Sequence, residues 1–218
     1  MTEAELLAAV DAAFEVTGLG LVPWPAPHPD RSPLDEEYSR VTDPSKWRII
    51  GARADAWMVA LADAGLGVGE RSAAVRWRVP PGTVISRTDR LAPYAAGALP
   101  LVIARSRIED IDDAGVTLGA GDPAVCVTWV PSCGCDACDD GAQYELDQLD
   151  AAILAVVRGV FRRLWKGDRE ITVFGDGSWN ATGLGHRHAL AVLAEPSGWD
   201  EVSGTSWLRE RFPRSPKR

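Results

Sequence analysis

Apolar residues recur at every third or fourth position in two stretches near the N-terminus, and residues that favour helix ends bound both stretches. The first follows Thr2 and Glu5, a capping box in which a hydroxyl and a carboxylate each bind a free backbone amide. The second follows residues 43–44, an aspartate N-cap with proline in the first turn, and extends to Gly65, a favourable C-terminal residue. The pattern therefore predicts two N-terminal helices.

The most regular helical pattern predicts a long helix over about residues 141–166. Acidic residues crowd its start and basic residues crowd its end, an arrangement that the helix dipole favours. Gly167 is a suitable residue to end it. The predicted apolar stripe consists of Leu146, Leu149, Ile153, Val156, Val160 and Leu164.

Between the second and third helices the period of the pattern changes from helical to strand-like. Short runs of alternating or β-branched residues follow one another with only turn residues between them, which favours an antiparallel sheet. In the last run we expect Val125 and Trp129 to share one face and Cys126 the other. The predicted strands are 73–79, 83–93, 99–108, 115–121 and 123–130.

Two segments outside this pattern have their own signals. Prolines at nearly every second position of residues 23–33 exclude a helix or a central strand, so we expect an extended arm that Trp24 pins to the body. Residues 169–183 predict a hairpin with an Asp-Gly turn at 176–177.

The elements together predict an α+β protein with N-terminal helices, a mostly antiparallel sheet and the 141–166 helix packed on that sheet. We expect one domain over residues 1–182. Residues 183–218 predict a C-terminal extension, packed on the same domain, with a short helix near 189–193 and a disordered tail at 213–218.

Charge and composition narrow the classes of partner. The net charge of −8 argues against a nucleic-acid groove or an anionic membrane surface, because both require basic patches. The N-terminus has no basic leader region and no apolar run approaches the length of a membrane span. We therefore expect a cytoplasmic protein, in which thiols stay reduced.

All four cysteines of the chain fall within residues 126–138, from the last predicted strand to the segment before the long helix. Cys133, Cys135 and Cys138 form a C-x-C-x2-C loop, and thiolates so spaced favour one soft metal ion such as zinc. Cys126 is a candidate fourth ligand if its strand ends beside the loop. The spacing is less specific than two C-x2-C pairs, so an alternative is that the thiols only pack.

Two further interpretations stay open. Cys138, with Cys135 as a resolving partner, is a candidate reactive thiol for redox or hydrolytic chemistry, although the neighbouring aspartates would raise its pKa. The acidic charge and the proline arm fit a protein-interaction or immunity-type protein. No catalytic triad, phosphate loop or dinucleotide motif accompanies the cysteines, so a non-enzymatic protein is favoured.

The segment Pro131–Asp139, with the helix that follows to Phe161, resembles an actinobacterial family of uncharacterised proteins, a domain of unknown function with a C-G-C-D-A-C-D motif. Residues 36–47 and 52–57 also resemble this family. The resemblance extends to about Asp168, and Cys126 lies outside the motif. It implies no activity.

Overall fold

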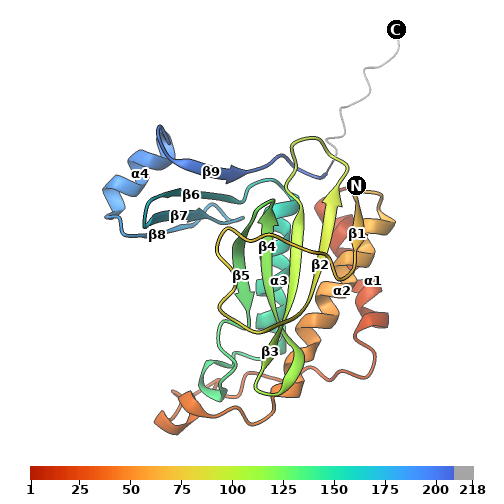
Figure 1. Cartoon of the computed structure of the whole chain (residues 1–218). Helices are drawn as coiled ribbons and strands as arrows, with labels where there is room; N and C mark the ends of the chain where they lie inside the picture. Colours follow the sequence, from red (N-terminus) through yellow and green to blue (C-terminus); the bar gives the residue numbers. More distant parts are fainter. Residues whose placement is uncertain (209–218) are drawn as a thin grey trace.

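A computed structural model describes residues 1–208, and it confirms the α+β class (Figure 1). Two antiparallel sheets form the framework, one of five strands in the order β1-β2-β3-β4-β5 and one of four in the order β8-β7-β6-β9. The first sheet comprises β1 Gly67–Glu70, β2 Ile85–Pro93, β3 Leu101–Ile108, β4 Ile111–Gly121 and β5 Ala124–Val130. The second comprises β6 Arg162–Lys166, β7 Arg169–Val173, β8 Trp179–Thr182 and β9 Asp200–Ser203.

Helices cover one face of the five-stranded sheet. These helices are α1 Glu3–Thr17, α2 Arg48–Asp63 and α3 Ala142–Val157, whereas α4 His186–Ala194 packs on the second sheet. The second and third lie against β4 and β5, and the first packs on the second (Figure 1). The core lies between these layers, and Trp47, Trp57 and Phe161 are fully buried there. No helix among residues 1–208 is both long and apolar enough to cross a bilayer.

The predicted helix starts are confirmed. Thr2 and Glu5 form both bonds of the capping box before α1. Asp43 accepts a hydrogen bond from the amide of Ser45, and one turn of 3₁₀-helix, η2 Pro44–Trp47, leads into α2. Two further short 3₁₀ turns, η1 Asp35–Ser39 and η3 Asp136–Cys138, lie in the segments before α2 and α3.

The predicted helix over 141–166 is wrong at its C-terminal end, because α3 stops at Val157 and residues 162–166 form β6. Gly159 has a φ of +70°, a conformation that ends a helix and that glycine adopts without strain. Leu164 then packs with Ile171 in a second apolar cluster between the four-stranded sheet and α4. Val160 and Leu164 of the predicted stripe are four residues apart, and that spacing fits one face of a strand as well as one face of a helix.

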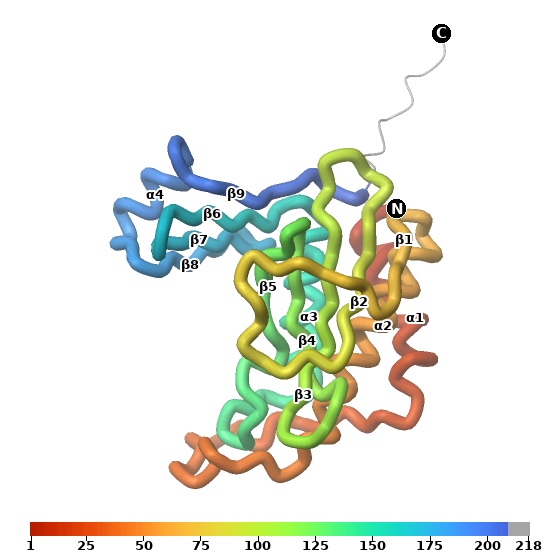
Figure 2. The backbone as a smooth tube through the Cα atoms, in the orientation of Figure 1, coloured from red at the N-terminus to blue at the C-terminus, as the bar shows by residue number. Residues whose placement is uncertain are grey.

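The predicted strand at 73–79 is also wrong. Residues 71–84 form an irregular connection that crosses the open face of the sheet in front of β4 and β5 (Figure 2). Its only pairing among the described residues is a bridge between Trp77 and Ala124. Trp77 lies so close to Gly119 that a Cβ there would meet its ring at 2.6 Å. The alternating pattern at 73–79 therefore does not mark a strand: its Trp77 ring packs on the backbone of Gly119 in β4.

The prediction that Val125 and Trp129 share one face of β5 is wrong, because β5 contains a β-bulge. Leu118 pairs with Thr128 but the next residue of β4 pairs with Cys126, so Val127 is the extra residue. A bulge shifts the alternation by one position. Trp129 is consequently 55% exposed, whereas Val125 is 3% exposed.

Residues 183–208 contribute to the second sheet and to the core. The predicted short helix is confirmed as α4, and β9 pairs with β6. Trp207 is buried, and its amide donates to the carbonyl of Val157. The domain division at residue 182 stays a prediction, and the expected disordered tail at 213–218 lies outside the described residues.

Candidate metal centre and adjoining cavity

The three cysteines of the C-x-C-x2-C loop converge between the end of β5 and the start of α3. The thiols of Cys133, Cys135 and Cys138 lie within 4.8 Å of one another, and the first two sulfurs are 3.2 Å apart. Zinc–sulfur bonds of about 2.3 Å place two sulfurs of a tetrahedral site about 3.8 Å apart. Small rotations of these side chains would therefore bring all three sulfurs to one metal ion.

The loop is closed on one side and open on the other. Cys135 is buried, Cys138 is half-buried and Cys133 is exposed. No fourth histidine, cysteine or carboxylate of residues 1–208 joins the three within the same distance. A metal held here would have these three thiols as its protein ligands among residues 1–208.

Asp136 anchors the loop to the segment before α2. Its carboxylate accepts hydrogen bonds from Arg40 Nε at 2.7 Å and from the amide of Thr42 at 2.9 Å. Desolvation raises the pKa of Asp136, but the bonds from Arg40 and Thr42 prevail and hold it at about 2. His28, on the proline arm, also contacts the Asp136 carbonyl, at 3.1 Å. The carboxylate is thus occupied in fixing the backbone.

Asp139 is the second anchor, and its side chain is 1% exposed. It accepts hydrogen bonds from Trp24 Nε1 at 2.8 Å and from the amide of Gly141 at 2.9 Å, and it forms an ion pair with Lys46. The expectation that Trp24 pins the arm is therefore met by a specific bond. Because Arg40 and Lys46 engage the two anchoring aspartates, neither carboxylate is free to serve as a metal ligand.

The thiols hold their protons unequally. Burial raises the pKa of Cys135, but hydrogen bonds from the thiols of Cys133 and Cys138 and from two backbone amides outweigh it and lower that pKa below its usual value. The hydrogen bond to Cys135, together with burial, raises the pKa of Cys138 to about 12. The negative charge of a first thiolate therefore opposes deprotonation of a second thiol, and a bound cation would remove this opposition.

A cysteine at the start of a helix gains reactivity because the helix amides and dipole favour its thiolate, but Cys138 does not begin α3. It instead ends the short turn η3, and α3 begins at Ala142 with Gly141 as its N-cap. The α3 amides and dipole consequently do not act directly on its sulfur.

Cys126 lies apart from the other three thiols, in the middle of β5. Its thiol donates to the carbonyl of Thr128 at 3.7 Å, and burial raises its pKa. Arg163 Nη1 donates to the Cys126 carbonyl at 2.7 Å. The structure therefore brings together Cys133, Cys135 and Cys138 but not the fourth predicted ligand.

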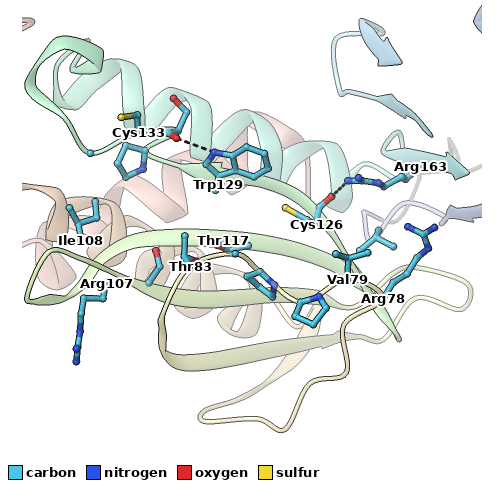
Figure 3. Close-up of a pocket in the computed structure, with 18 of the residues that line it drawn as sticks. Arg78, Val79, Thr83, Arg107, Ile108, Thr117, Cys126, Trp129, Cys133 and Arg163 are labelled. Atoms are coloured by element: carbon cyan, nitrogen blue, oxygen red, sulfur yellow. Dashed lines mark hydrogen bonds between the residues drawn. The ribbon is translucent and has the colours of Figure 1, made fainter. Parts of the chain in front are cut away.

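A cavity of about 590 Å³ adjoins the cysteine loop (Figure 3). Cys133 lies at one end, Arg78 and Arg163 lie at the other, and Trp129 stands between them. The indole of Trp129 donates to the carbonyl of Ser132 at 3.1 Å. The crossing connection contributes Arg78 and the five residues that follow it, Val79, Pro80, Pro81, Gly82 and Thr83.

The sequence did not indicate this cavity. Arg163 fell inside the predicted helix, and the bulge that places Trp129 on the same face as Cys126 leaves no local signal. The proline pair at 80–81, which excludes a continuous strand, was the one feature that pointed to a connection here.

Comparison with known proteins identifies a family only. A protein-family model described as "Family of unknown function (DUF6226)" matches residues 10–212, a range that includes the cysteine loop and the cavity. No curated protein and no solved structure matches the chain.

Proposed function

Because the chain belongs to this family of unknown function, its role must be argued from its residues, and we propose that it binds one soft metal ion, zinc, through Cys133, Cys135 and Cys138. The observation that carries the proposal is the convergence of the three sulfurs in a loop whose Asp136 and Asp139 are bound by residues outside it.

The ligand chemistry favours zinc over a hard cation. Thiolates prefer zinc and other soft ions, whereas calcium and magnesium prefer several oxygen ligands. The aspartates nearest the thiols are bound to Arg40 and Lys46 instead. A sulfur-only protein set is therefore what the loop offers.

Metal binding would also offset the repulsion between neighbouring thiolates. Each ligand thiol must lose its proton, and the raised pKa of Cys138 opposes that loss when no cation is bound. A divalent ion between the sulfurs favours all three thiolates at once. Binding should release protons and weaken as the pH falls.

The centre differs from a closed structural zinc site, which has four protein ligands. With three thiolates, the fourth position belongs to water or to an added ligand. This leaves the centre able to bind an exchangeable group, and it separates the proposal from a purely structural loop.

Elemental analysis of native protein purified without chelator tests the proposal, together with a count of reactive thiols. We expect about one zinc per chain, with three thiols protected until a chelator is added. Cys135→Ser should abolish zinc retention, whereas Cys126→Ser should retain it. Protein that stays metal-free after zinc addition, with the loop thiols titrating freely, would refute the proposal.

X-ray absorption at the zinc edge then tests the ligand set. Three sulfurs and one oxygen or nitrogen are expected. Four sulfurs would assign Cys126 as the fourth ligand and require movement of β5 relative to the loop.

A further inference from the structure

The cavity beside the cysteine loop has two chemically different parts. Its walls are mostly apolar, formed by Val79 and the following prolines on one side and by Trp129 on the other. Trp129 and Val79 are 55% and 62% exposed, so large apolar surfaces line a space that solvent enters. Its volume of about 590 Å³ lies within the usual range for small-molecule sites.

The end of the cavity farther from Cys133 carries uncompensated positive charge (Figure 3). Arg78 Nη1 bonds Glu170 at 3.0 Å, and Arg163 is ion-paired to the same carboxylate. Two guanidinium groups thus share one carboxylate, which leaves one positive charge. Arg163 donates one N–H to the Cys126 carbonyl and one to Glu170, which uses two of the five N–H donors of a guanidinium, and its side chain is 21% exposed.

Both arginines are held in place by the fold. Arg163 donates to the Cys126 carbonyl, and the guanidinium of Arg78 stacks 4.1 Å from the centre of the Trp165 ring. A preorganised guanidinium with a free donor forms strong hydrogen bonds with an anionic oxygen, because little freedom is lost on binding. A cationic ligand is disfavoured because Glu170 is already paired twice.

We propose that this cavity binds a small organic anion with a flat apolar body, its anionic group at Arg163 and Arg78 and its body between Trp129 and the proline connection. The site does not depend on a metal, since only Cys133 is shared with the thiol cluster. The anion supplies the missing partner for the arginine pair, and the body covers the exposed apolar walls.

A matched pair of fluorescent probes separates the two parts of the site. 8-Anilinonaphthalene-1-sulfonate has an aromatic body with one anionic group, and N-phenyl-1-naphthylamine has nearly the same body without the charge. We expect the sulfonate to bind saturably at one site per chain. Arg163→Gln should weaken it about tenfold or more, the typical effect of losing a charge-assisted hydrogen bond, while leaving the neutral probe unchanged.

The adjacent residue on β6 provides the control variant. Arg162 does not line the cavity and pairs with Glu201 at 3.0 Å, so Arg162→Gln should leave both probes unaffected. Arg78→Gln repeats the charge test should Arg163→Gln fail to fold. Trp129→Ala, at an exposed position, should weaken both probes.

The proposal is overturned if neither probe binds saturably, if the arginine substitutions leave the sulfonate unaffected, or if they weaken both probes equally. It is likewise overturned if Trp129→Ala changes neither probe. Metal-free and zinc-loaded protein should give the same sulfonate affinity within about twofold, so that loss of the metal proposal leaves this one standing.

Discussion

Asp139→Asn should destabilise the protein more than any other single change in the cysteine loop. The side chain is 1% exposed and joins three segments that are distant in the sequence. It binds Trp24 of the proline arm, Lys46 of η2 and the amide of Gly141 before α3. Asparagine preserves the shape but removes the charge and replaces one acceptor oxygen with a donor, which would face donors already present.

The magnitude follows from what the substitution leaves unpaired. Removing one partner from a fully buried ion pair costs about 3–5 kcal/mol. Lys46 is 20% exposed and can partly rehydrate, so the cost should be about 1 kcal/mol less than this range. We expect a loss of about 2–4 kcal/mol in the free energy of unfolding, which in a chain of this size corresponds to a fall of roughly 4–16 °C in Tm.

Urea denaturation followed by tryptophan fluorescence measures this loss, with Asp140→Asn as the control. Asp140 is the next residue along the chain, carries the same charge and is exposed. A difference below about 0.5 kcal/mol between the two variants, the usual range for surface changes, would refute the idea that Asp139 anchors the loop.

Three further predictions concern α3 and its ends. Gly159→Ala should cost more than about 1 kcal/mol, because φ is +70° and the added Cβ would lie 2.5 Å from backbone; Gly82→Ala, where nothing lies within 4 Å, should be near neutral in the same urea titration. Burial, with the carboxylates that precede the helix, raises the pKa of Glu145 to about 7, so its stabilising contribution is full below about pH 4.5 and is lost as the pH rises through 7. Unfolding curves from pH 4.5 to 8 should show the stability of wild type falling relative to Glu145→Gln, and a constant difference would contradict the shift. Asp150→Asn should cost about 2–4 kcal/mol, because it breaks a bidentate pair with the buried Arg53, and unchanged thermal unfolding would contradict that.

The elements that sequence reasoning found correctly have local causes. The capping box at Thr2 and the aspartate–proline pair at 43–44 act within one turn of helix, so a single sequence reveals them. The four runs that became β2 to β5 were likewise identified, because their β-branched residues pack into a sheet whichever strand lies beside them.

The errors arise where a distant contact decides the local structure. Residues 162–166 carry both helical and alternating spacing, and only the pairing of β6 with β7 and β9 selects the strand. Trp77 alternates with polar neighbours, yet its backbone forms only a single bridge, to Ala124 at the start of β5, and its ring lies on Gly119. In neither case does the local sequence contain the partner.

The candidate site also has one part that the sequence indicated and one part that it did not. The convergence of Cys133, Cys135 and Cys138 follows from their spacing within one tight loop, which is why the sequence indicated it. The cavity is built from the connection before β2, the bulge in β5 and the start of β6. No pattern within one segment predicts such an assembly.

The bracing of the cysteine loop bears on whether the thiols merely pack. Asp136 and Asp139 already fix the loop backbone through Arg40, Thr42, Trp24 and Lys46, and none of these bonds involves sulfur. The exposed thiol of Cys133 contributes little apolar burial, and its closeness to two other thiols opposes deprotonation of the group. Packing alone does not require three sulfurs to face one point, although the thiols hydrogen-bond one another there. Their convergence therefore supports the proposal of a shared metal ion.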